Sequence, residues 1–354
     1  MSSNGHDPTF ATICPVPITE TPRILLGHGS GGRLTAKLVE EIILPAFRNP
    51  LLEPLDDAAI LSPGGHRLAF TTDSYVVTPI FFPGGDIGEL AVNGTVNDLA
   101  VSGARPLALS LAFILEEGFA LADFERIVRS IKRAADMAGV SVATGDTKVV
   151  GRGCADKIFI NTSGIGLLPD GLELSSRKVC AGDAVLLSGT VGDHGIAILS
   201  CREGLEFGGD LASDTAPVAG LVSAVLSACR SVHAMRDPTR GGVAATLVEI
   251  ATRQAVGIEV DEALVPVRDA VRGAAEMLGL DPLLVANEGK IVVFVPEEGA
   301  DAALAAMREH PLGRHAARIG RVSREHPGVV WVRTTIGGAR ILELPFAEIL
   351  PRIC

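Results

Sequence analysis

Short acidic motifs, in which an aspartate stands beside small or polar residues, recur along the sequence. Carboxylate oxygens are preferred ligands of hard divalent cations, and Mg²⁺ on a nucleotide typically takes one or two protein carboxylates. Several converging aspartates with one lysine therefore suit a site for Mg²⁺ and a triphosphate. A single such aspartate is more often a turn or N-cap residue, so the prediction depends on the whole set. The motifs are "DDAAI" (Asp56, Asp57), "TTDS" (Asp73), "NGTVND" (Asn97, Asp98), "GDTK" (Asp146, Lys148), "GDHG" (Asp193) and "DPTRGG" (Asp237).

Within this set we expect the metal contacts to come from Asp57, Asp73 and Asp98, with Asp56 next. If the Asp56 and Asp57 pair is extended, its two side chains point to opposite sides, so one of them is expected at the metal. Lys148 could neutralise charge on a transferring phosphoryl group. Further nucleotide contacts are expected from two other residues of the same motifs, Asn97 and Asp146.

A glycine-rich stretch, "LLGHGSGGRLT", lies near the N-terminus. Glycines allow backbone N–H groups to approach phosphate oxygens closely, and a helix that starts after such a loop points its positive end at them. We therefore expect Gly29, Gly31 and Gly32 to contact the nucleotide. The stretch is not a Walker A motif, because Arg33 stands where lysine is needed. A flexible connection is the alternative interpretation.

The chain ends in "PRIC", which places a thiol, Cys354, at its last position. The six cysteines form no CxxC pair and no zinc-ligand spacing, so they are expected to be free thiols of a reducing compartment. Only nine residues follow Pro345, too few for another packed element. We expect residues 346–354 to be a mobile tail.

Length and charge limit the possible functions. A chain of 354 residues, 47% of them hydrophobic, is long enough for two domains. A net charge of -11 argues against nucleic acid as a partner. The N-terminus lacks the pattern of a secretory signal, and there is no apolar run long enough to span a membrane. The expected location is the cytoplasm.

Hydrophobic patterns indicate two successive α/β blocks. In the first, strands are expected in 66–77 and 105–118, and helices in 86–106 and 121–139, with Gly139 ending the second helix. In the second block, a glycine turn feeds a helix in 236–253, and strands are expected in 183–189, 290–296, 329–334 and 340–345. The predicted domains are an extension (1–23), an N-terminal domain (24–168), a C-terminal domain (169–345) and the tail.

The motifs in this order resemble one family, the HypE carbamoyl dehydratases of hydrogenase maturation. The resemblance rests on "GHGSGG", "DDAAI", the segment from "TTDSYVV" to "NGTVNDLA", "GDTKVV", "GDHGIAIL", "DPTRGG", "DPLLVANEGK" and the terminal "PRIC", and it spans residues 24–354. Ser30 and Asn93 depart from the residues expected there, glycine and cysteine.

The resemblance implies a fold of the superfamily typified by aminoimidazole ribonucleotide synthetase (PurM). Such a fold has two α/β domains, of which the first forms a homodimer through its mixed sheet, with ATP in a cleft near the subunit interface. It also implies that a HypF-type carbamoyltransferase loads a carbamoyl group onto Cys354. This enzyme then dehydrates the thiocarbamate to a thiocyanate with ATP. The cyano group passes to iron on a HypC–HypD-type scaffold and becomes a cyanide ligand of a [NiFe]-hydrogenase. The match at "NEGK" makes Glu288 the expected proton acceptor or orienter of the amide nitrogen, whereas the sequence alone also fits a charged turn at the start of a strand.

Two other classes of function remain open on the sequence. A selenophosphate synthetase or thiamine-phosphate kinase of the same superfamily would share the internal motifs. The first would normally have a reactive Cys or Sec followed closely by Lys near its N-terminus, and Cys14 has no such neighbour. A non-catalytic thiol carrier would use Cys354 but would need no nucleotide site.

Overall fold

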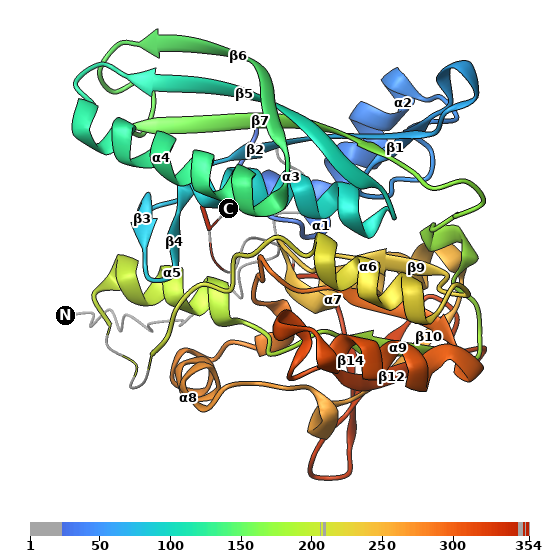
Figure 1. The fold of residues 1–354 in the computed structure, drawn as a ribbon. Coiled ribbons are helices and arrows are strands. Elements are labelled where there is room, and N and C mark those ends of the chain that lie inside the picture. Colours follow the sequence, from blue (N-terminus) through green and yellow to red (C-terminus); the bar gives the residue numbers. More distant parts are fainter. Residues whose placement is uncertain (1–22, 206, 208–209, 346–349, 351, 354) are drawn as a thin grey trace, which may run out of the picture.

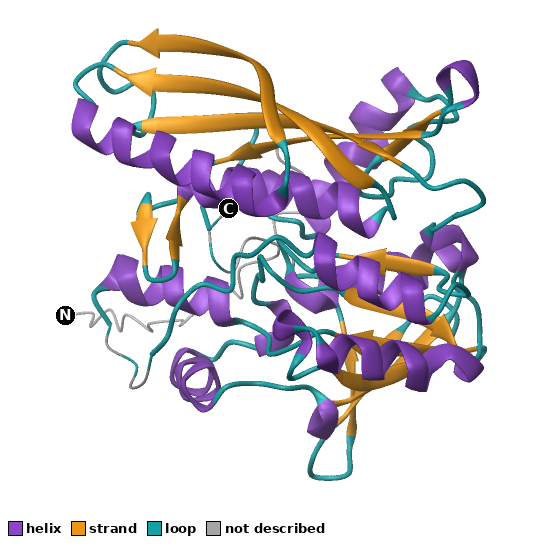
Figure 2. Cartoon of the chain, viewed as in Figure 1, coloured by secondary structure: helices purple, strands orange, loops and turns teal. Residues whose placement is uncertain are grey.

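Two β-sheets, each covered by helices, make up the protein (Figure 1). The computed structural model describes residues 23–205, 207, 210–345, 350 and 352–353. The first sheet and its helices are formed by the N-terminal half of the chain, and the second sheet by the C-terminal half. Figure 2 shows the two units stacked, with the helices of the first sheet facing the second unit. An α/β fold with two units is what the hydrophobic patterns predict.

The first sheet is mixed and has five strands in the order β1-β2-β7-β5-β6. β5 and β6 run parallel, while the other pairs are antiparallel. Two helices, α3 and α4, cover its inner face through apolar residues such as Leu90 and Ile127, both fully buried. The bounds are β1 Ala59–Leu61, β2 Leu68–Tyr75, β5 Arg105–Glu116, β6 Ser141–Val150, β7 Ile158–Leu167, α3 Ile87–Val101 and α4 Leu121–Ala138.

The outer face of this sheet has no helix over it in the described chain. Phe70 and Ile165 pair across β2 and β7 and remain 42% and 40% exposed, and Ile114 of β5 is 44% exposed. Strand β6 lies at the edge, and nine of its ten residues are exposed. An open edge next to an apolar face is typical of a surface that pairs with another chain.

The second sheet has seven strands in the order β14-β13-β10-β12-β8-β11-β9. Its central strands β8 and β11 are buried on both sides, because α6 and α9 pack on one face and α7 on the other. β8 illustrates this, since all five of its residues are buried. The bounds are β8 Asp183–Leu187, β9 Ala234–Arg236, β10 Gly257–Asp261, β11 Val292–Pro296, β12 Ala317–Ser323, β13 Val330–Arg333, β14 Ala339–Leu342, α5 Asp193–Glu203, α6 Ala219–Ala228, α7 Gly242–Gln254, α8 Asp269–Leu278 and α9 Glu297–Glu309.

The remaining described elements are short. Helices α1 (Arg33–Leu38) and α2 (Leu44–Phe47) follow the glycine-rich stretch, and β3 (Phe81–Phe82) and β4 (Gly85–Asp86) form a hairpin before α3. No helix among the described residues is both long and apolar enough to cross a membrane.

The strands and helices expected from the sequence are confirmed within a few residues. Gly139, with φ of 68°, ends α4 in the left-handed conformation that glycine adopts without strain. The "GDTK" motif differs from expectation, because it lies in the middle of β6 instead of at the end of an element.

Candidate functional site

An acidic cavity lies between the two units, where β2 and α3 of the first face β9 and α7 of the second. Its volume is about 190 Å³. Both units contribute charged groups, so the cavity exists only when the units are stacked. The lining residues that carry charge or an ionisable hydroxyl are Asp57, Asp73, Tyr75, Asp98, Arg236, Asp237, Arg240, Glu249 and Glu288.

Three carboxylates converge in this cavity. Oxygens of Asp57, Asp98 and Asp237 all lie within 4.8 Å of one another. Asp57 precedes β1, Asp98 lies in the last turn of α3, and Asp237 directly follows β9. Thr71 Oγ1 lies 2.7 Å from Asp98 Oδ2 and 2.9 Å from the Asp57 carbonyl oxygen, so its single proton is shared between these two acceptors and links Asp57 to Asp98.

The pKa values of these three carboxyl groups are raised, because the charged form of each is less stable in the cavity than in water. Burial raises the pKa of Asp57 to about 6; neighbouring carboxylates add to the shift and Arg236 opposes it. The pKa values of Asp98 and Asp237 are raised well above the usual range, first by burial and then by the surrounding aspartates. Clustered buried carboxylates of this kind are stabilised when a cation binds between them. The all-oxygen ligand set fits a hard divalent ion such as Mg²⁺.

Arg236 forms an ion pair with a member of this cluster. Its Nε lies 2.7 Å from Asp57 Oδ1, and its Nη2 lies 3.8 Å from Glu249 Oε2. The guanidinium is largely buried, so the ion pair is little screened by water. Because Asp57 belongs to the first unit and Arg236 to the second, this pair also joins the two units.

Asp56 points away from the cavity. Its carboxylate accepts from the Ser175 hydroxyl (2.8 Å) and from the Ser176 N–H (3.2 Å), in the segment that connects the two sheets. The expected alternation of neighbouring side chains therefore holds, with Asp57 on the cavity side. The structure does not bring Asp56 to the other three aspartates.

Asp73 lines the cavity from β2. Its side chain lies on the inner face of the sheet, as does that of Tyr75, whose hydroxyl donates to Asp73 Oδ2 (3.3 Å). Burial raises the pKa of Tyr75 well above 10, and the neighbouring Asp73 adds to this, so Tyr75 keeps its proton and acts as a donor. Asp73 is thus beside the cluster of three and supplies a fourth carboxylate to the cavity.

Glu288 is buried at the cavity wall. It is 3% exposed, and its Oε1 accepts no hydrogen bond from the residues that the structure describes. Burial raises its pKa well above the usual range, and Asp237 and Asp214 add to the effect. Such a carboxyl can exchange a proton near neutral pH, which a solvated glutamate does poorly.

A hydrogen-bond network positions Glu288. Asp214 Oδ1 accepts from the Glu288 N–H (3.0 Å), while Asp214 Oδ2 pairs with Lys290 Nζ (2.8 Å). Asn97 Nδ2 donates to the carbonyls of Glu288 (3.1 Å) and Ala216 (3.0 Å). Asn97 Oδ1 also accepts a backbone N–H, that of Val218, at 2.8 Å. The Asn97 amide is thus fully engaged by the backbone of the second unit, so it acts here as a positioning group.

The glycine-rich stretch packs beside the cavity. Arg240, which lines the cavity, donates to the Gly29 carbonyl (2.9 Å). A side chain at Gly31 would lie 2.9 Å from the Arg240 carbonyl oxygen, and one at Gly32 would lie 2.6 Å from the Pro345 carbonyl oxygen. Close backbone approach therefore requires glycine at both positions. Gly29 has open space around it, with nothing within 4 Å of where a Cβ would be.

Asp146 and Lys148 lie outside the cavity. Both are exposed on β6, where they form an ion pair of 2.7 Å with each other. β6 is three strands from β2, which corresponds to about 14 Å at the usual strand spacing. Across the sheet, Asp146 lies in the same row of paired residues as Ser74, through Ala112 and Asn161. Its side chain is therefore on the outer face, opposite to that of Asp73. These two residues therefore cannot serve the cavity of their own chain.

The tail has three described residues, and contacts hold each of them. Leu350 and Ile353 are 8% and 6% exposed and belong to a hydrophobic cluster. Arg352 forms an ion pair with Asp156, and its carbonyl accepts from Arg202 Nη2 (2.8 Å) and the Thr78 N–H (3.1 Å). The predicted acceptor, Cys354, lies outside the described residues, and the mobility of the tail stays a prediction.

His194 contacts the end of this tail. Its Nε2 is 2.6 Å from the Ile353 carbonyl, and its Nδ1 is 2.7 Å from Ser213 Oγ. The imidazole is fully buried, which lowers its pKa, so it is neutral. A neutral ring that donates to the carbonyl from Nε2 accepts at Nδ1 from the Ser213 hydroxyl. Ser213 precedes Asp214, which holds Glu288.

Sequence reasoning placed several residues of the cavity and missed others. The structure brings together Asp57, Asp73, Asp98 and Glu288, with the glycine stretch beside them. Asp237 was recognised as an acidic motif but was not assigned to the metal. Arg236, Arg240 and Asp214 were not identified, although Arg236 and Arg240 flank Asp237 in "RDPTRGG".

Comparisons with known proteins identify relatives over nearly the whole chain. The family model described as AIR synthase related protein, N-terminal domain, matches residues 55–168, and the corresponding C-terminal domain model matches residues 181–333. The protein named carbamoyl dehydratase HypE from Rhizobium leguminosarum bv. viciae is 53% identical over 333 residues, covering 94% of this chain and 95% of the relative.

Two solved structures of similar proteins share the fold. The crystal structure of a HypE-HypF complex matches with a TM-score of 0.83 and 47% identity, covering 87% of this chain and 99% of the other. The crystal structure of hydrogenase maturation protein HypE in complex with ATP matches with a TM-score of 0.79 and 50% identity, covering 94% of this chain and all (100%) of the other. The expected two-domain architecture is confirmed.

Proposed function

Because this chain belongs to the HypE family of carbamoyl dehydratases, we propose that it converts a carbamoyl group on its own Cys354 into a cyano group, using ATP and Mg²⁺. The product is a thiocyanate on the terminal sulfur. The observation that carries this proposal is the contact between the tail and the cavity wall. His194 binds both the Ile353 carbonyl and Ser213, the residue before Asp214, and Asp214 accepts from the Glu288 N–H.

The reaction needs ATP because the amide oxygen is a poor leaving group. In the proposed first step, the carbonyl oxygen of the thiocarbamate attacks the γ-phosphate, ADP leaves, and the nitrogen loses one proton. In the second step, the remaining N–H proton is removed as the C–O bond breaks, which releases phosphate and leaves S–C≡N. The oxygen of the lost water thus ends in phosphate. Such phosphoryl transfer depends mainly on positioning and on charge neutralisation.

Glu288 is our candidate for accepting the nitrogen protons. Its buried carboxyl has a raised pKa and an Oε1 atom that accepts no hydrogen bond within the described part of the chain, and both properties suit proton exchange. The hydrogen bonds from Asn97 and to Asp214 fix its backbone, so the carboxyl group is directed into the cavity by two independent elements.

Asp57, Asp98 and Asp237 are the residues that would hold Mg²⁺, with Asp73 beside them. The ion would neutralise the phosphate charges next to these carboxylates. At about 190 Å³ the cavity is smaller than the ~300–1,000 Å³ of typical small-molecule sites. We therefore assign it to the metal and the phosphate end of ATP, with the glycine stretch near the phosphates.

We also propose that the protein is a homodimer formed through the outer face of the first sheet. Phe70, Ile114 and Ile165 are exposed on that face next to the open edge strand β6. Asp146 and Lys148 of one chain would then serve the cavity of the second copy, which gives Lys148 its proposed charge-neutralising function. Within a single chain the two residues have no such use.

The expected partners follow from the same chemistry. A HypF-type carbamoyltransferase would supply the carbamoyl group, consistent with the solved complex of HypE and HypF relatives. A HypC–HypD-type scaffold would receive the cyano group on iron and provide a cyanide ligand for a [NiFe]-hydrogenase. These encounters are proposed to take place in the cytoplasm.

Mass spectrometry of the tail peptide tests the proposal. Protein carbamoylated on Cys354 should lose the mass of one water only when both Mg²⁺ and ATP are present. Cys354→Ala should bind Mg²⁺ and ATP normally but show neither modification. If carbamoylated protein kept its mass under these conditions, the dehydratase proposal would fail. Retained turnover of a small molecule by Cys354→Ala would instead favour a kinase or synthetase, and loss of nucleotide binding with intact scaffold binding would favour a thiol carrier.

A further inference from the structure

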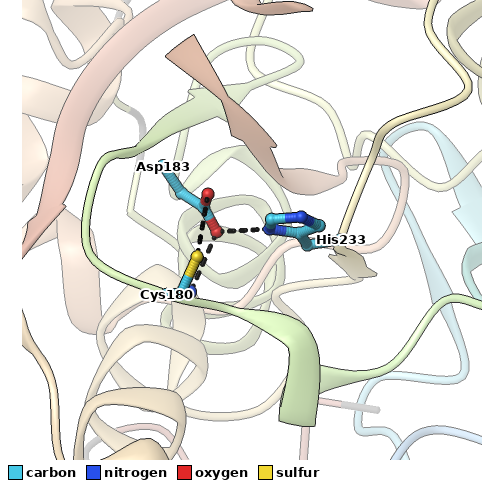
Figure 3. Close-up of side chains that lie close together, drawn as sticks. All are labelled: Cys180, Asp183 and His233. Carbon is cyan, nitrogen blue, oxygen red and sulfur yellow. Dashed lines mark hydrogen bonds and ion pairs between the residues drawn. The ribbon is translucent and has the colours of Figure 1, made fainter.

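A second cluster of metal-binding side chains lies outside the acidic cavity, at the start of the second sheet. Cys180, Asp183 and His233 each present one ligand atom within 4.8 Å of the other two. Figure 3 shows the three side chains pointing toward one another. Among the described residues, this cluster and the Asp57, Asp98 and Asp237 cluster are the ones that meet this criterion.

The contacts in the cluster centre on Asp183, whose side chain is 2% exposed. Its Oδ2 is 2.9 Å from His233 Nδ1 and accepts from the Cys180 N–H (3.1 Å). Its Oδ1 accepts a weak hydrogen bond from Cys180 Sγ at 3.7 Å. Within the cluster, Oδ1 therefore contacts Cys180 Sγ, and Oδ2 contacts His233 Nδ1 and the Cys180 N–H.

The distances are close to those of a tetrahedral zinc site. With Zn–S near 2.3 Å and Zn–O and Zn–N near 2.1 Å, sulfur and oxygen ligands stand about 3.6 Å apart, and nitrogen and oxygen ligands about 3.4 Å. The observed 3.7 Å joins Cys180 Sγ to Asp183 Oδ1 and the observed 2.9 Å joins His233 Nδ1 to Asp183 Oδ2, so the Asp183 carboxylate would have to rotate for one oxygen to stand between the other two ligands. Cys180 is exposed and the His233 side chain is 25% exposed, so an ion can reach the cluster from solvent.

The backbone around the cluster is well fixed. The Asp183 N–H donates to the Cys180 carbonyl (3.2 Å), which closes a tight turn, and the Gly182 N–H donates to Val322 of β12 (3.0 Å). The His233 N–H donates to Phe294 of β11 (2.9 Å). All three ligands are therefore carried by segments already held to the sheet, which lowers the entropic cost of gathering them around an ion.

We propose that Cys180, Asp183 and His233 bind a thiophilic divalent cation of the Zn²⁺ class, at a site separate from the acidic cavity. One thiolate, one imidazole and one carboxylate make a mixed ligand set that favours Zn²⁺ or Co²⁺ over Mg²⁺. Three protein ligands leave one tetrahedral position for water. The proposal does not depend on the dehydratase activity.

Binding requires a change of protonation at two ligands. The Cys180 thiol gives up its proton to solvent, and sulfur donates its electron pair to the cation. His233 binds through Nδ1 as the neutral tautomer that carries its proton on Nε2. Without a cation, burial and the nearby Asp183 raise the pKa of Cys180, so the thiol is neutral and unreactive. The cation offsets the repulsion between thiolate and carboxylate.

The site would connect parts of the chain that serve the acidic cavity. Cys180 belongs to the segment between the two sheets, Asp183 opens β8, and His233 immediately precedes β9. Strand β9 ends at Arg236, and Asp237 follows it in the cavity. A bound cation would thus tie the connecting segment to the base of the strand that carries two cavity residues, and would stabilise the second unit.

Cobalt binding to the full-length, tag-free protein tests the proposal. In a Cys354→Ala background, which removes the tail thiol, and with excess Mg²⁺ present to occupy the acidic cavity, Co²⁺ should bind in a one-to-one ratio and give a thiolate-to-cobalt charge-transfer absorption band. Zn²⁺ should abolish the band by displacement, and an excess of Mg²⁺ should leave it. Cys180→Ser should remove the band, and His233→Gln should weaken Co²⁺ binding by at least about tenfold. Cys154→Ser and Cys201→Ser, at other exposed cysteines, should change neither property.

Two results would overturn the proposal. One is the absence of a thiolate band at Co²⁺ concentrations that saturate typical protein sites. The other is a band that survives Cys180→Ser or Cys180→Ala while disappearing in Cys154→Ser or Cys201→Ser. Because residue 180 is exposed, circular dichroism should show that these variants fold normally. Unchanged Mg²⁺ and ATP affinity in Cys180→Ser is expected, and it separates a failure of this site from a failure of the proposed function.

Discussion

His194 Nε2 lies 2.6 Å from the carbonyl oxygen of Ile353, the residue before the terminal cysteine. These two residues are 159 positions apart, and the hydrogen bond is buried. It fixes the backbone one residue before the proposed acceptor, at the wall that also holds Glu288. The geometry explains why a histidine in "GDHG" can matter for the reaction that we propose on the tail.

Replacing His194 should slow dehydration without affecting nucleotide binding. His194→Ala removes a buried hydrogen bond worth about 1–3 kcal/mol, so the single-turnover rate should fall about tenfold to a hundredfold. His194→Gln keeps an N–H donor near the Nε2 position and should recover part of the rate. Calorimetry should show unchanged Mg²⁺ and ATP affinity in both variants. His315→Gln, at an exposed histidine, is the control. Equal losses in the Ala and Gln variants would argue against positioning by this hydrogen bond.

Asp56 and Asp57 form a matched pair for testing the metal assignment. Asp57→Asn should weaken Mg²⁺ and ATP binding by about tenfold or more, as expected for the loss of a ligand. Asp56→Asn should leave this affinity unchanged, because its carboxylate faces Ser175 and Ser176. Its expected effect is a loss of stability of about 1 kcal/mol. Equal affinities in the two variants would remove Asp57 from the metal site.

The raised pKa of Asp57 predicts that ligand affinity depends on pH. The cation requires deprotonated carboxylates, so the wild-type affinity for Mg²⁺ and nucleotide should fall as the pH falls. Asp57, with a pKa of about 6, takes up a proton as the pH falls through that value, and the raised pKa values of Asp98 and Asp237 act in the same direction. Calorimetric titrations of Asp57→Asn should show a shallower dependence below about pH 6, since one fewer proton competes. An identical slope in both proteins would contradict the assigned origin of the effect.

Asp98→Asn should stabilise the ligand-free protein while weakening ligand binding. The pKa of Asp98 is raised in the fold, so the unfolded chain loses its proton first and stability falls as the pH rises above 3.8, the ordinary value. Asparagine carries no such charge and can still accept from Thr71. The ligand-free melting temperature at neutral pH should rise by roughly 2–4 °C for each kcal/mol gained. Adding Mg²⁺ and ATP should reverse the order, because only the wild type gains binding energy. Asp301→Asn, at an exposed aspartate, should change neither melting temperature.

Hybrid dimers test whether Lys148 serves the second copy. Dimers that combine one Lys148→Ala chain with one Asp98→Asn chain would contain one intact composite site and one doubly altered site. Differently tagged chains allow such hybrids to be purified, and they should recover up to about half of the wild-type activity. Each variant alone should be inactive. A hybrid as inactive as its parents would show that both residues serve the same chain.

Much of the fold could be predicted because it depends on local patterns. The periodic apolar residues of α4, followed by Gly139, determine a helix and its end. The alternation in β2 likewise assigns Asp73 to the face opposite Ser74. The position of "GDTK" was less clear from the sequence, because Gly145 and Asp146 are typical of turns. Pairing with β5 overrides that local preference.

The composition of the site depends on contacts that a single sequence does not contain. Arg236 is recognisable only once β9 is stacked against the segment that holds Asp57. The engagement of Asn97 by the backbone near Ala216 and Glu288 depends in the same way on the packing of one unit against the other. The held tail is a further example, since its partners Asp156, Arg202 and His194 are distant in sequence.

The adjacent residues Asp56 and Asp57 also have a mechanical consequence. Asp56 accepts a hydrogen bond from Ser175 in the connecting segment, and Asp57 forms an ion pair with Arg236 of the second unit. Two adjacent residues of the first unit therefore hold both the connecting segment and the second unit in place. A rotation that separates the two units would have to break the largely buried ion pair between Asp57 and Arg236, at a cost of about 3–5 kcal/mol. We therefore expect the joint between the two halves of the molecule to remain stiff.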